Sequence, residues 1–167
     1  MTMIKKLTLP ALAGTLAATA LLATSPVQAQ YRQKISNDTS KCTAGSGSAV
    51  WVTVNGVSAS KGTIRVQTYR ANAQDWLESG RWLSRIEAPA KAGQMKFCLP
   101  VPGPGSYGVA VRHDLNNNGK TDLSADGGAM SNNPSLNVFN LGKPSYKKVA
   151  FPVGNGVKSI GINMRYM

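Results

Sequence analysis

The feature that most constrains this chain is a two-residue alternation of apolar and polar side chains, which recurs along most of its length. The clearest segments are rich in β-branched residues: AVWVTVNGV (49–57), GTIRVQTYR (62–70), QMKFCLPV (94–101) and SYGVAVRH (106–113). Further candidates are RWLSRIEA (81–88), YKKVAFPV (146–153) and VKSIGINMRY (157–166). This period turns one side of a strand toward a core and the other toward solvent. The pattern therefore predicts strands rather than helices.

The strand candidates are short, and clusters of Gly, Pro, Asn and Ser separate them. About seven antiparallel strands in a stretch of this length are typical of a single-domain all-β sandwich, of the immunoglobulin or transthyretin kind. The alternative is a small outer-membrane barrel, which needs eight spans of about ten residues with an unbroken apolar outward face. Because the alternation ends too early for a barrel, we predict an antiparallel β-sandwich over residues 48–167.

The N-terminus has the parts of a secretory signal peptide. Lys5 and Lys6 precede an uncharged apolar stretch over residues 7–23, and VQA at 27–29 has the small-x-small pattern that signal peptidase recognises. The alternative is a membrane anchor, but a proline and a glycine interrupt the stretch, and its length is marginal for a bilayer of roughly 30 Å. We expect residues 1–29 to be removed. The mature chain would then begin with a polar lead-in over residues 30–47, contain no transmembrane segment, and be periplasmic or secreted.

The two cysteines agree with export. Cys42 and Cys98 form an even set, which in an oxidising compartment usually means a disulfide bond. Two buried free thiols are the alternative. A bond would tie the polar lead-in to the strands that follow it.

The charge balance points to acidic partners. The formal net charge is +12, and +10 without Lys5 and Lys6. Such an excess attracts polyanions. An exported protein rarely meets nucleic acid, so we expect an anionic polysaccharide or lipid of the envelope as partner. A solvated basic surface without a specific partner is the alternative.

One loop, HDLNNNGKTD over residues 113–122, has the spacing of a calcium site. Calcium loops of the EF-hand type place oxygens at positions one, three, five, seven and nine, with glycine at six. The corresponding residues are Asp114, Asn116, Asn118, the carbonyl of Lys120, and Asp122. Position twelve would be alanine instead of the usual glutamate, so a site here should be weak, with a dissociation constant on the order of 0.1 to 1 mM. The alternative is a polar hairpin turn at the Asn-Gly pair.

This loop and its surroundings resemble a known family. GSYGVAVRHDLNNNGKTD (105–122), SNNP (131–134) and GKPSYKKVAFPV (142–153) are similar to the exported bacterial family called domain-of-unknown-function family 2141. The resemblance implies export and a β-sandwich, and it implies no particular activity. Members commonly carry a G-x-P-x-E-G stretch after the loop. Here LSADGGAM (123–130) replaces it, so a glutamate that could complete a metal shell is absent.

Other candidates for binding lie near the loop and in one long connection. Trp76, Arg81 and Trp82 would suit a sugar ring or an acidic glycan if the rings are exposed, and both rings in the core is the alternative. His113 is the only histidine, and it either contacts a ligand or braces the loop from the edge of the core.

The sequence contains neither of two common hydrolase motifs, G-x-S-x-G and H-E-x-x-H. We therefore expect a non-catalytic binding or accessory module of the cell envelope with a weak structural calcium loop. A metal-free structural envelope protein held by its basic surface is the alternative, and a hydrolase is a remote one.

Overall fold

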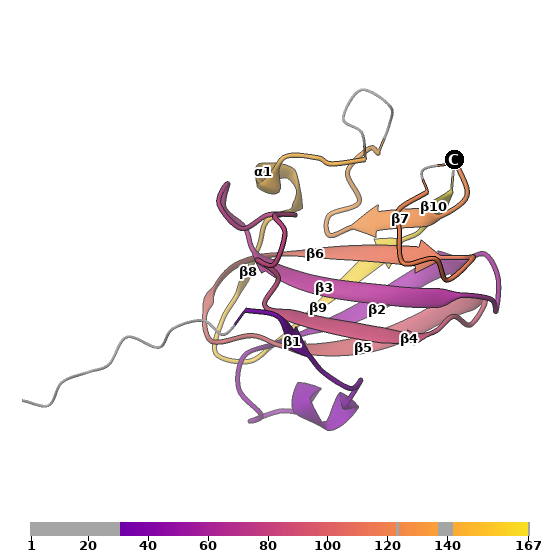
Figure 1. Cartoon of the computed structure of the whole chain (residues 1–167). Coiled ribbons are helices and arrows are strands. Elements are labelled where there is room, and N and C mark those ends of the chain that lie inside the picture. The colour runs from indigo at the N-terminus through magenta and orange to yellow at the C-terminus, as the bar shows by residue number, and fades with distance from the viewer. Residues whose placement is uncertain (1–30, 123, 137–141, 167) are drawn as a thin grey trace, which may run out of the picture.

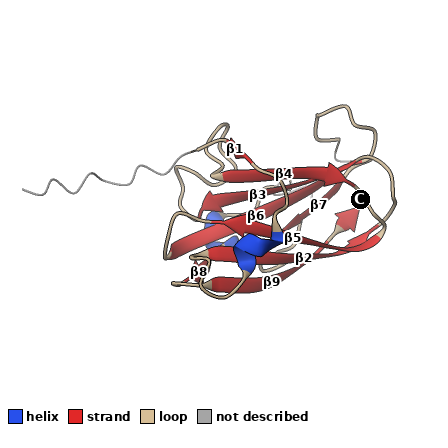
Figure 2. Ribbon diagram, turned by 90° about the horizontal axis from the view of Figure 1, so that it is seen from below, coloured by secondary structure: helices blue, strands red, loops and turns tan. Residues whose placement is uncertain are grey.

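The structure, a computed structural model, describes residues 31–122, 124–136 and 142–166. The predicted signal peptide over residues 1–29 lies outside the described residues. Strands dominate the described part, and they form two sheets that stack on each other (Figures 1 and 2). Within the described residues, no helix combines the length and the apolar character needed to span a bilayer.

Seven strands form the larger sheet, in the order β1 (Gln33–Lys34), β4 (Ser84–Pro89), β3 (Thr63–Arg70), β6 (Gly105–Asp114), β7 (Gly127–Met130) and β10 (Arg165–Tyr166), with β8 (Phe151–Val153) also paired to β6. Three strands form the smaller sheet, in the order β5 (Gly93–Pro100), β2 (Ala49–Val57) and β9 (Val157–Asn163). Two short helices complete the described part: η1 (Thr39–Cys42) and α1 (Tyr146–Val149).

The prediction of an all-β sandwich is confirmed, and its sheets are mixed rather than wholly antiparallel. β1 runs parallel to β4, and β9 runs parallel to β2. The described residues form ten strands, because the alternation did not reveal the short strands β1 and β7, and because one predicted segment forms both β9 and β10. Alternation identifies the buried face of a strand, but it carries no information on the direction of the neighbouring strand.

The main core lies between the two sheets. Val50, Val52 and Val54 of β2 are fully buried, as the alternation predicted, and they belong to the same cluster as Ile64 and Val66 of β3. Burial of this apolar face is the main stabilising contribution to the sandwich.

The last predicted strands differ from the structure in two places. Tyr146–Val149 is a helical turn rather than part of a strand, since the side chain of Ser145 accepts a hydrogen bond from the amide of Lys147 and caps it. Only Phe151–Val153 continues as β8. The segment over 157–166 divides at Met164 into β9 and β10, which join different sheets.

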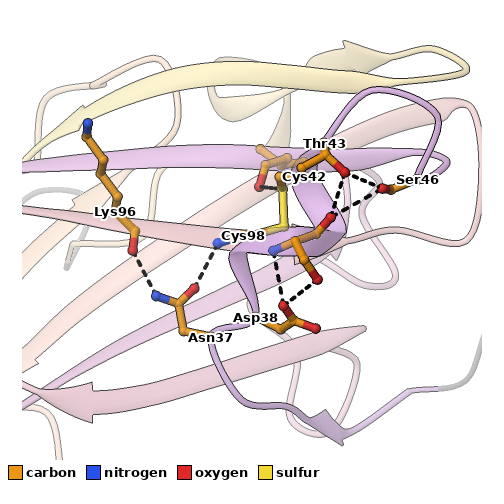
Figure 3. The surroundings of a disulfide bond; sticks show 9 residues. Asn37, Asp38, Cys42, Thr43, Ser46, Lys96 and Cys98 are labelled. Atoms are coloured by element: carbon orange, nitrogen blue, oxygen red, sulfur yellow. Dashed lines mark hydrogen bonds between the residues drawn. A yellow bond between two sulfur atoms is a disulfide. The ribbon is translucent and has the colours of Figure 1, made fainter.

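The lead-in is an ordered part of the sandwich. Cys42 and Cys98 form the predicted disulfide bond, which attaches η1 to the edge strand β5 (Figure 3). The side chain of Asn37 donates to the carbonyl of Lys96 at 2.9 Å and accepts from the amide of Cys98 at 3.0 Å. One amide side chain therefore pairs with the open edge of β5 as a neighbouring strand would, which protects that edge from other chains.

Candidate functional site

The polar loop is carried by β6, the central strand of the larger sheet. Tyr107, Val109, Val111 and His113 point into the core, which leaves Arg112 and Asp114 on the outward face. β6 ends at Asp114, and the chain returns as β7, with Arg112 opposite Gly128. The rigid ends of two paired strands therefore hold both ends of the loop.

Side chains of the loop hydrogen-bond to its own backbone, as the Asn and Asp side chains of a polar turn do. The side-chain oxygen of Asn116 accepts from the amide of Asn118 at 3.0 Å, and that of Asn118 accepts from the amide of Lys120 at 2.8 Å. The Oδ2 atom of Asp114 accepts from the amide of Gly119 at 2.9 Å. Gly119 has φ of +75°, which glycine adopts without strain.

Two predicted ligands converge on a third. The Nδ2 atoms of Asn116 and Asn118 donate to Oδ2 of Asp122, at 3.0 and 2.6 Å. These hydrogen bonds lower the pKa of Asp122, because they favour the charged carboxylate. The structure thus brings Asn116, Asn118 and Asp122 together, while Asp114 joins the loop through Gly119.

Asp126 closes the loop, and it was missing from the predicted ligand set. Its Oδ1 accepts from the amide of Leu115 at 3.2 Å, and its Oδ2 accepts from the amide of Asp122 at 3.0 Å. The side chain is buried although it carries a charge. The only signal in the sequence for a role of Asp126 was its position, one residue after position twelve of the calcium-loop pattern.

Arg112 is the second residue that the sequence did not single out. Its guanidinium donates to Oδ2 of Asp114 at 3.2 Å, to the carbonyl of Gly119 at 3.1 Å and to the hydroxyl of Thr121 at 3.0 Å. Burial lowers the pKa of Arg112, and the nearby charge of Arg65 acts in the same direction. The guanidinium therefore joins both sides of the loop as an internal cation.

One oxygen of the loop is left without a partner. Oδ1 of Asp114 is buried, and no donor among the described residues reaches it; the residue as a whole is only 4% exposed. A buried, unpaired carboxylate oxygen is costly, since its desolvation is not compensated. Such an atom fits a ligand of a hard cation, which binds oxygens.

The donor set for a metal ion is otherwise weak. Among the described residues, no three His, Cys, Asp or Glu side chains are grouped so that they could hold a metal ion. A calcium ion here would depend on amide oxygens of Asn116 and Asn118 and on the carbonyl of Lys120 as well as on carboxylates. Each amide oxygen accepts one backbone hydrogen bond and keeps a second lone pair.

His113 braces the loop from the core. The imidazole is fully buried, its Nε2 lies 2.7 Å from the carbonyl of Lys61, and its Nδ1 lies 2.8 Å from the hydroxyl of Tyr166. A carbonyl only accepts, so Nε2 carries the proton and Nδ1 accepts from Tyr166 in the neutral ring. Both ring nitrogens are used within the protein. Of the two alternatives for His113, the brace agrees with this geometry, and the fully buried ring is not accessible to a ligand.

The tryptophans of the 71–83 connection are also buried, so the core alternative holds for both rings rather than the exposed one. Trp76 and Trp82 are 7% and 8% exposed and belong to a second cluster on the outer face of the larger sheet. Trp76 packs edge-on against Tyr69, and its indole nitrogen donates to the carbonyl of Pro144 at 2.8 Å. Gly108 makes room for it, since a Cβ there would lie 2.7 Å from the Trp76 ring.

Arg81 keeps an exposed side chain at the edge of this connection. Its Nε lies 3.4 Å from the carboxylate of Asp75, and its guanidinium lies 5.0 Å from the centre of the Tyr31 ring. The hydroxyl of Tyr31 also donates to Asp75. Arg81 therefore holds the N-terminal segment against the connection.

These features define an all-β sandwich with a polar, glycine-containing loop at the end of its central strand. The family model of "Uncharacterized protein conserved in bacteria (DUF2141)" matches residues 52–161, which include the strands from β3 to β8 and the whole loop. The chain belongs to this family, as the sequence predicted. Comparisons with curated proteins and with solved structures find no match.

Proposed function

We propose that this protein is an exported, non-catalytic binding or accessory module of the bacterial cell envelope, whose 114–126 loop binds one calcium ion weakly. The ion would fix the loop rather than take part in a reaction. The partner would be an anionic polysaccharide or lipid, in keeping with the formal net charge of +12.

Export is supported by two features of the chain. The N-terminal sequence has the pattern of a signal peptide. The Cys42–Cys98 disulfide bond is of the kind that persists in oxidising compartments. Both agree with a periplasmic or secreted protein.

The observation that carries the calcium proposal is the unpaired Oδ1 of Asp114. The other carboxylate oxygen, Oδ2, already accepts hydrogen bonds from Gly119 and Arg112. Oδ1 is therefore the oxygen of this buried carboxylate that has no hydrogen-bond partner among the described residues. Asn116, Asn118, the carbonyl of Lys120, and Asp122 would supply the further oxygens. Calcium would contribute only charge and coordination, which would hold these oxygens in place.

A non-catalytic role is supported by the way the titratable groups are used. Both ring nitrogens of His113 form hydrogen bonds, one with the carbonyl of Lys61 and one with the hydroxyl of Tyr166. The buried carboxylate of Asp75 accepts hydrogen bonds from Asn72 and Tyr31, and that of Asp126 accepts from two backbone amides. Each of these groups forms hydrogen bonds that stabilise the fold, and none of them is free to act as a general base.

A second candidate is the metal-free envelope protein, and the position of Arg112 favours it. The guanidinium already joins Asp114, Gly119 and Thr121 without any metal. If this cation is sufficient, the loop needs no calcium, and the basic surface alone would hold the protein to anionic material.

A calcium titration of the melting temperature separates the two candidates. With a dissociation constant of about 1 mM, about 10 mM calcium should stabilise the fold by roughly 1.4 kcal/mol. For a domain of this size that is a rise of roughly 3 to 5 °C. Asp122→Asn should lose most of the rise, because it removes a charged ligand but keeps the shape of the side chain.

Glu78→Gln is the matched control, since Glu78 is an exposed carboxylate outside the loop. It should respond to calcium as the parent does, and EDTA should return the parent to its starting temperature. A parent that does not respond, or an Asp122→Asn variant that responds fully, would refute the calcium proposal and leave the metal-free candidate.

A further inference from the structure

A groove of about 630 Å³ lies on the outer face of the larger sheet, beside the polar loop. Its floor comes from β3, β6 and β7. Thr121, Asp122 and Asp126 from the polar loop also line it, together with Leu136, Lys143 and Tyr166. The volume is in the range of sites for small molecules, which is about 300 to 1,000 Å³.

Arginines cross the floor of this groove in one row. Arg65 of β3 is directly opposite Arg112 of β6, Arg112 is opposite Gly128 of β7, and Gly128 is opposite Arg165 of β10. Since directly opposed residues share a face of the sheet, the three guanidinium groups belong to the same surface. Gly128 has no side chain and leaves open space between Arg112 and Arg165.

Like charges that lie side by side repel and destabilise the fold, so each guanidinium group needs an acidic partner or solvent. Arg65 has Glu87 at 2.7 Å, and Arg112 has Asp114 at 3.2 Å. Arg165 and Lys143 are exposed, and neither forms an ion pair with a described residue. These two cations are therefore available to an anion in the groove.

The acidic residues of the groove are already occupied. Asp122 accepts from two asparagine side chains, and Asp126 accepts from two backbone amides. The lining as a whole contains the cations Arg65, Arg112, Lys143 and Arg165 against these two carboxylates. The balance favours an anionic ligand.

Part of the lining of the groove is apolar. Leu77, Ala110 and Leu136 are partly buried and pack against the cluster that contains Met130. Leu136 approaches the open space above Gly128, since a Cβ at that position would lie 3.7 Å from its Cδ1 atom. Cationic and apolar surfaces therefore meet within one groove.

We propose that this groove binds an anionic amphiphile, a molecule with one carboxylate or phosphate head and an alkyl chain of about eight to ten carbons. Guanidinium groups match the planar geometry of carboxylate and phosphate oxygens. The alkyl chain covers Leu77, Leu136 and Met130. The proposal goes beyond the calcium loop and does not require a metal ion.

Calorimetric titration of the whole chain with four probes tests it: acetate, octanoate, decanoate and 1-octanol. Octanoate should bind, while acetate and 1-octanol should bind at least tenfold more weakly, because each lacks one half of the ligand. Decanoate should bind roughly 15-fold more tightly than octanoate, since each buried methylene contributes about fourfold in affinity.

Arg165→Gln and Lys143→Gln should each weaken octanoate binding about fivefold to tenfold, by loss of one charge-assisted hydrogen bond. Lys158→Gln is the matched control, because Lys158 is an exposed cation on β9 of the other sheet. It should leave the affinity unchanged. Melting temperatures of the three variants show that each is folded.

Vesicles of phosphatidylglycerol distinguish the source of the ligand. If the protein sediments with these vesicles and Arg165→Gln reduces the sedimented fraction, the ligand is a lipid head group. If the protein binds decanoate but does not sediment with the vesicles, the ligand is a free fatty acid. Octanoate that binds no better than acetate, or a Lys158→Gln effect as large as that of Arg165→Gln, would overturn the proposal.

Discussion

Replacing both cysteines of the Cys42–Cys98 disulfide with serine measures how far one covalent bond stabilises this sandwich. The bond joins residues 56 positions apart. In the chain-entropy model, a loop of this length stabilises the folded state by about 4 kcal/mol at 25 °C, because it restricts the unfolded chain. For a domain of this size the melting temperature should fall by roughly 10 to 15 °C.

Urea unfolding followed by tryptophan fluorescence is a suitable assay, since Trp76 and Trp82 are buried. The double variant should unfold at lower urea concentration. It should also show a larger dependence of the free energy of unfolding on urea, because the unfolded chain without the bond is less compact. This second change separates an effect on the unfolded state from the loss of native contacts.

Asn37→Ala is the control, because it removes two hydrogen bonds of the same segment and leaves the disulfide intact (Figure 3). It should destabilise by about 1 to 2 kcal/mol without changing the urea dependence. If the double cysteine variant loses less than about 1 kcal/mol, or no more than Asn37→Ala, the reasoning from chain entropy is refuted.

Three further predictions follow from buried contacts. Tyr166→Phe should destabilise by about 1 to 3 kcal/mol in urea unfolding, because Nδ1 of the buried His113 loses its donor; an unchanged midpoint would contradict the assigned brace. Burial raises the pKa of Tyr69 to about 12. Stability should therefore be complete below pH 10 and fall by up to about 1.4 kcal/mol per pH unit as the pH rises toward 12. In Tyr69→Phe the free energy of unfolding should not show this decrease between about pH 10 and pH 12. Urea unfolding of the parent and of the variant at each pH measures the difference. Gly62→Ala should destabilise by more than about 2 kcal/mol, since Gly62 has φ of +78° and a Cβ there would overlap the carbonyl oxygen of Asp114; a melting temperature equal to that of the parent would contradict it.

The sequence predicted the strands whose alternation is long and uninterrupted. β2 coincides with the segment read from the sequence, and β3, β5 and β6 agree to within one residue at each end. The disulfide bond also followed from the sequence, because two cysteines in a chain with the pattern of a signal peptide predict a bond between them. These are local signals, and a tertiary contact does not override them.

The features that the sequence did not predict depend on tertiary contacts. Trp76 and Trp82 are buried because the 71–83 connection folds back over the sheet, and Gly108 was the only local hint of that approach. Arg112 and Asp126 belong to the loop through hydrogen bonds that spacing alone does not reveal. The parallel pairing of β9 with β2 joins segments that have no sequence signal in common.

That parallel pairing has a consequence for the order in which the molecule can fold. β2 is the middle strand of the smaller sheet, and its pairing with β9 places Asn55 beside Asn163, 108 positions later, with a hydrogen bond of 3.1 Å between their side chains. Contacts over such separations are entropically slow to form, so folding in milliseconds to seconds is expected. Until β9 has been synthesised, one edge of β2 has no neighbour. The C-terminal end of the chain therefore completes the sandwich that the N-terminal strands begin.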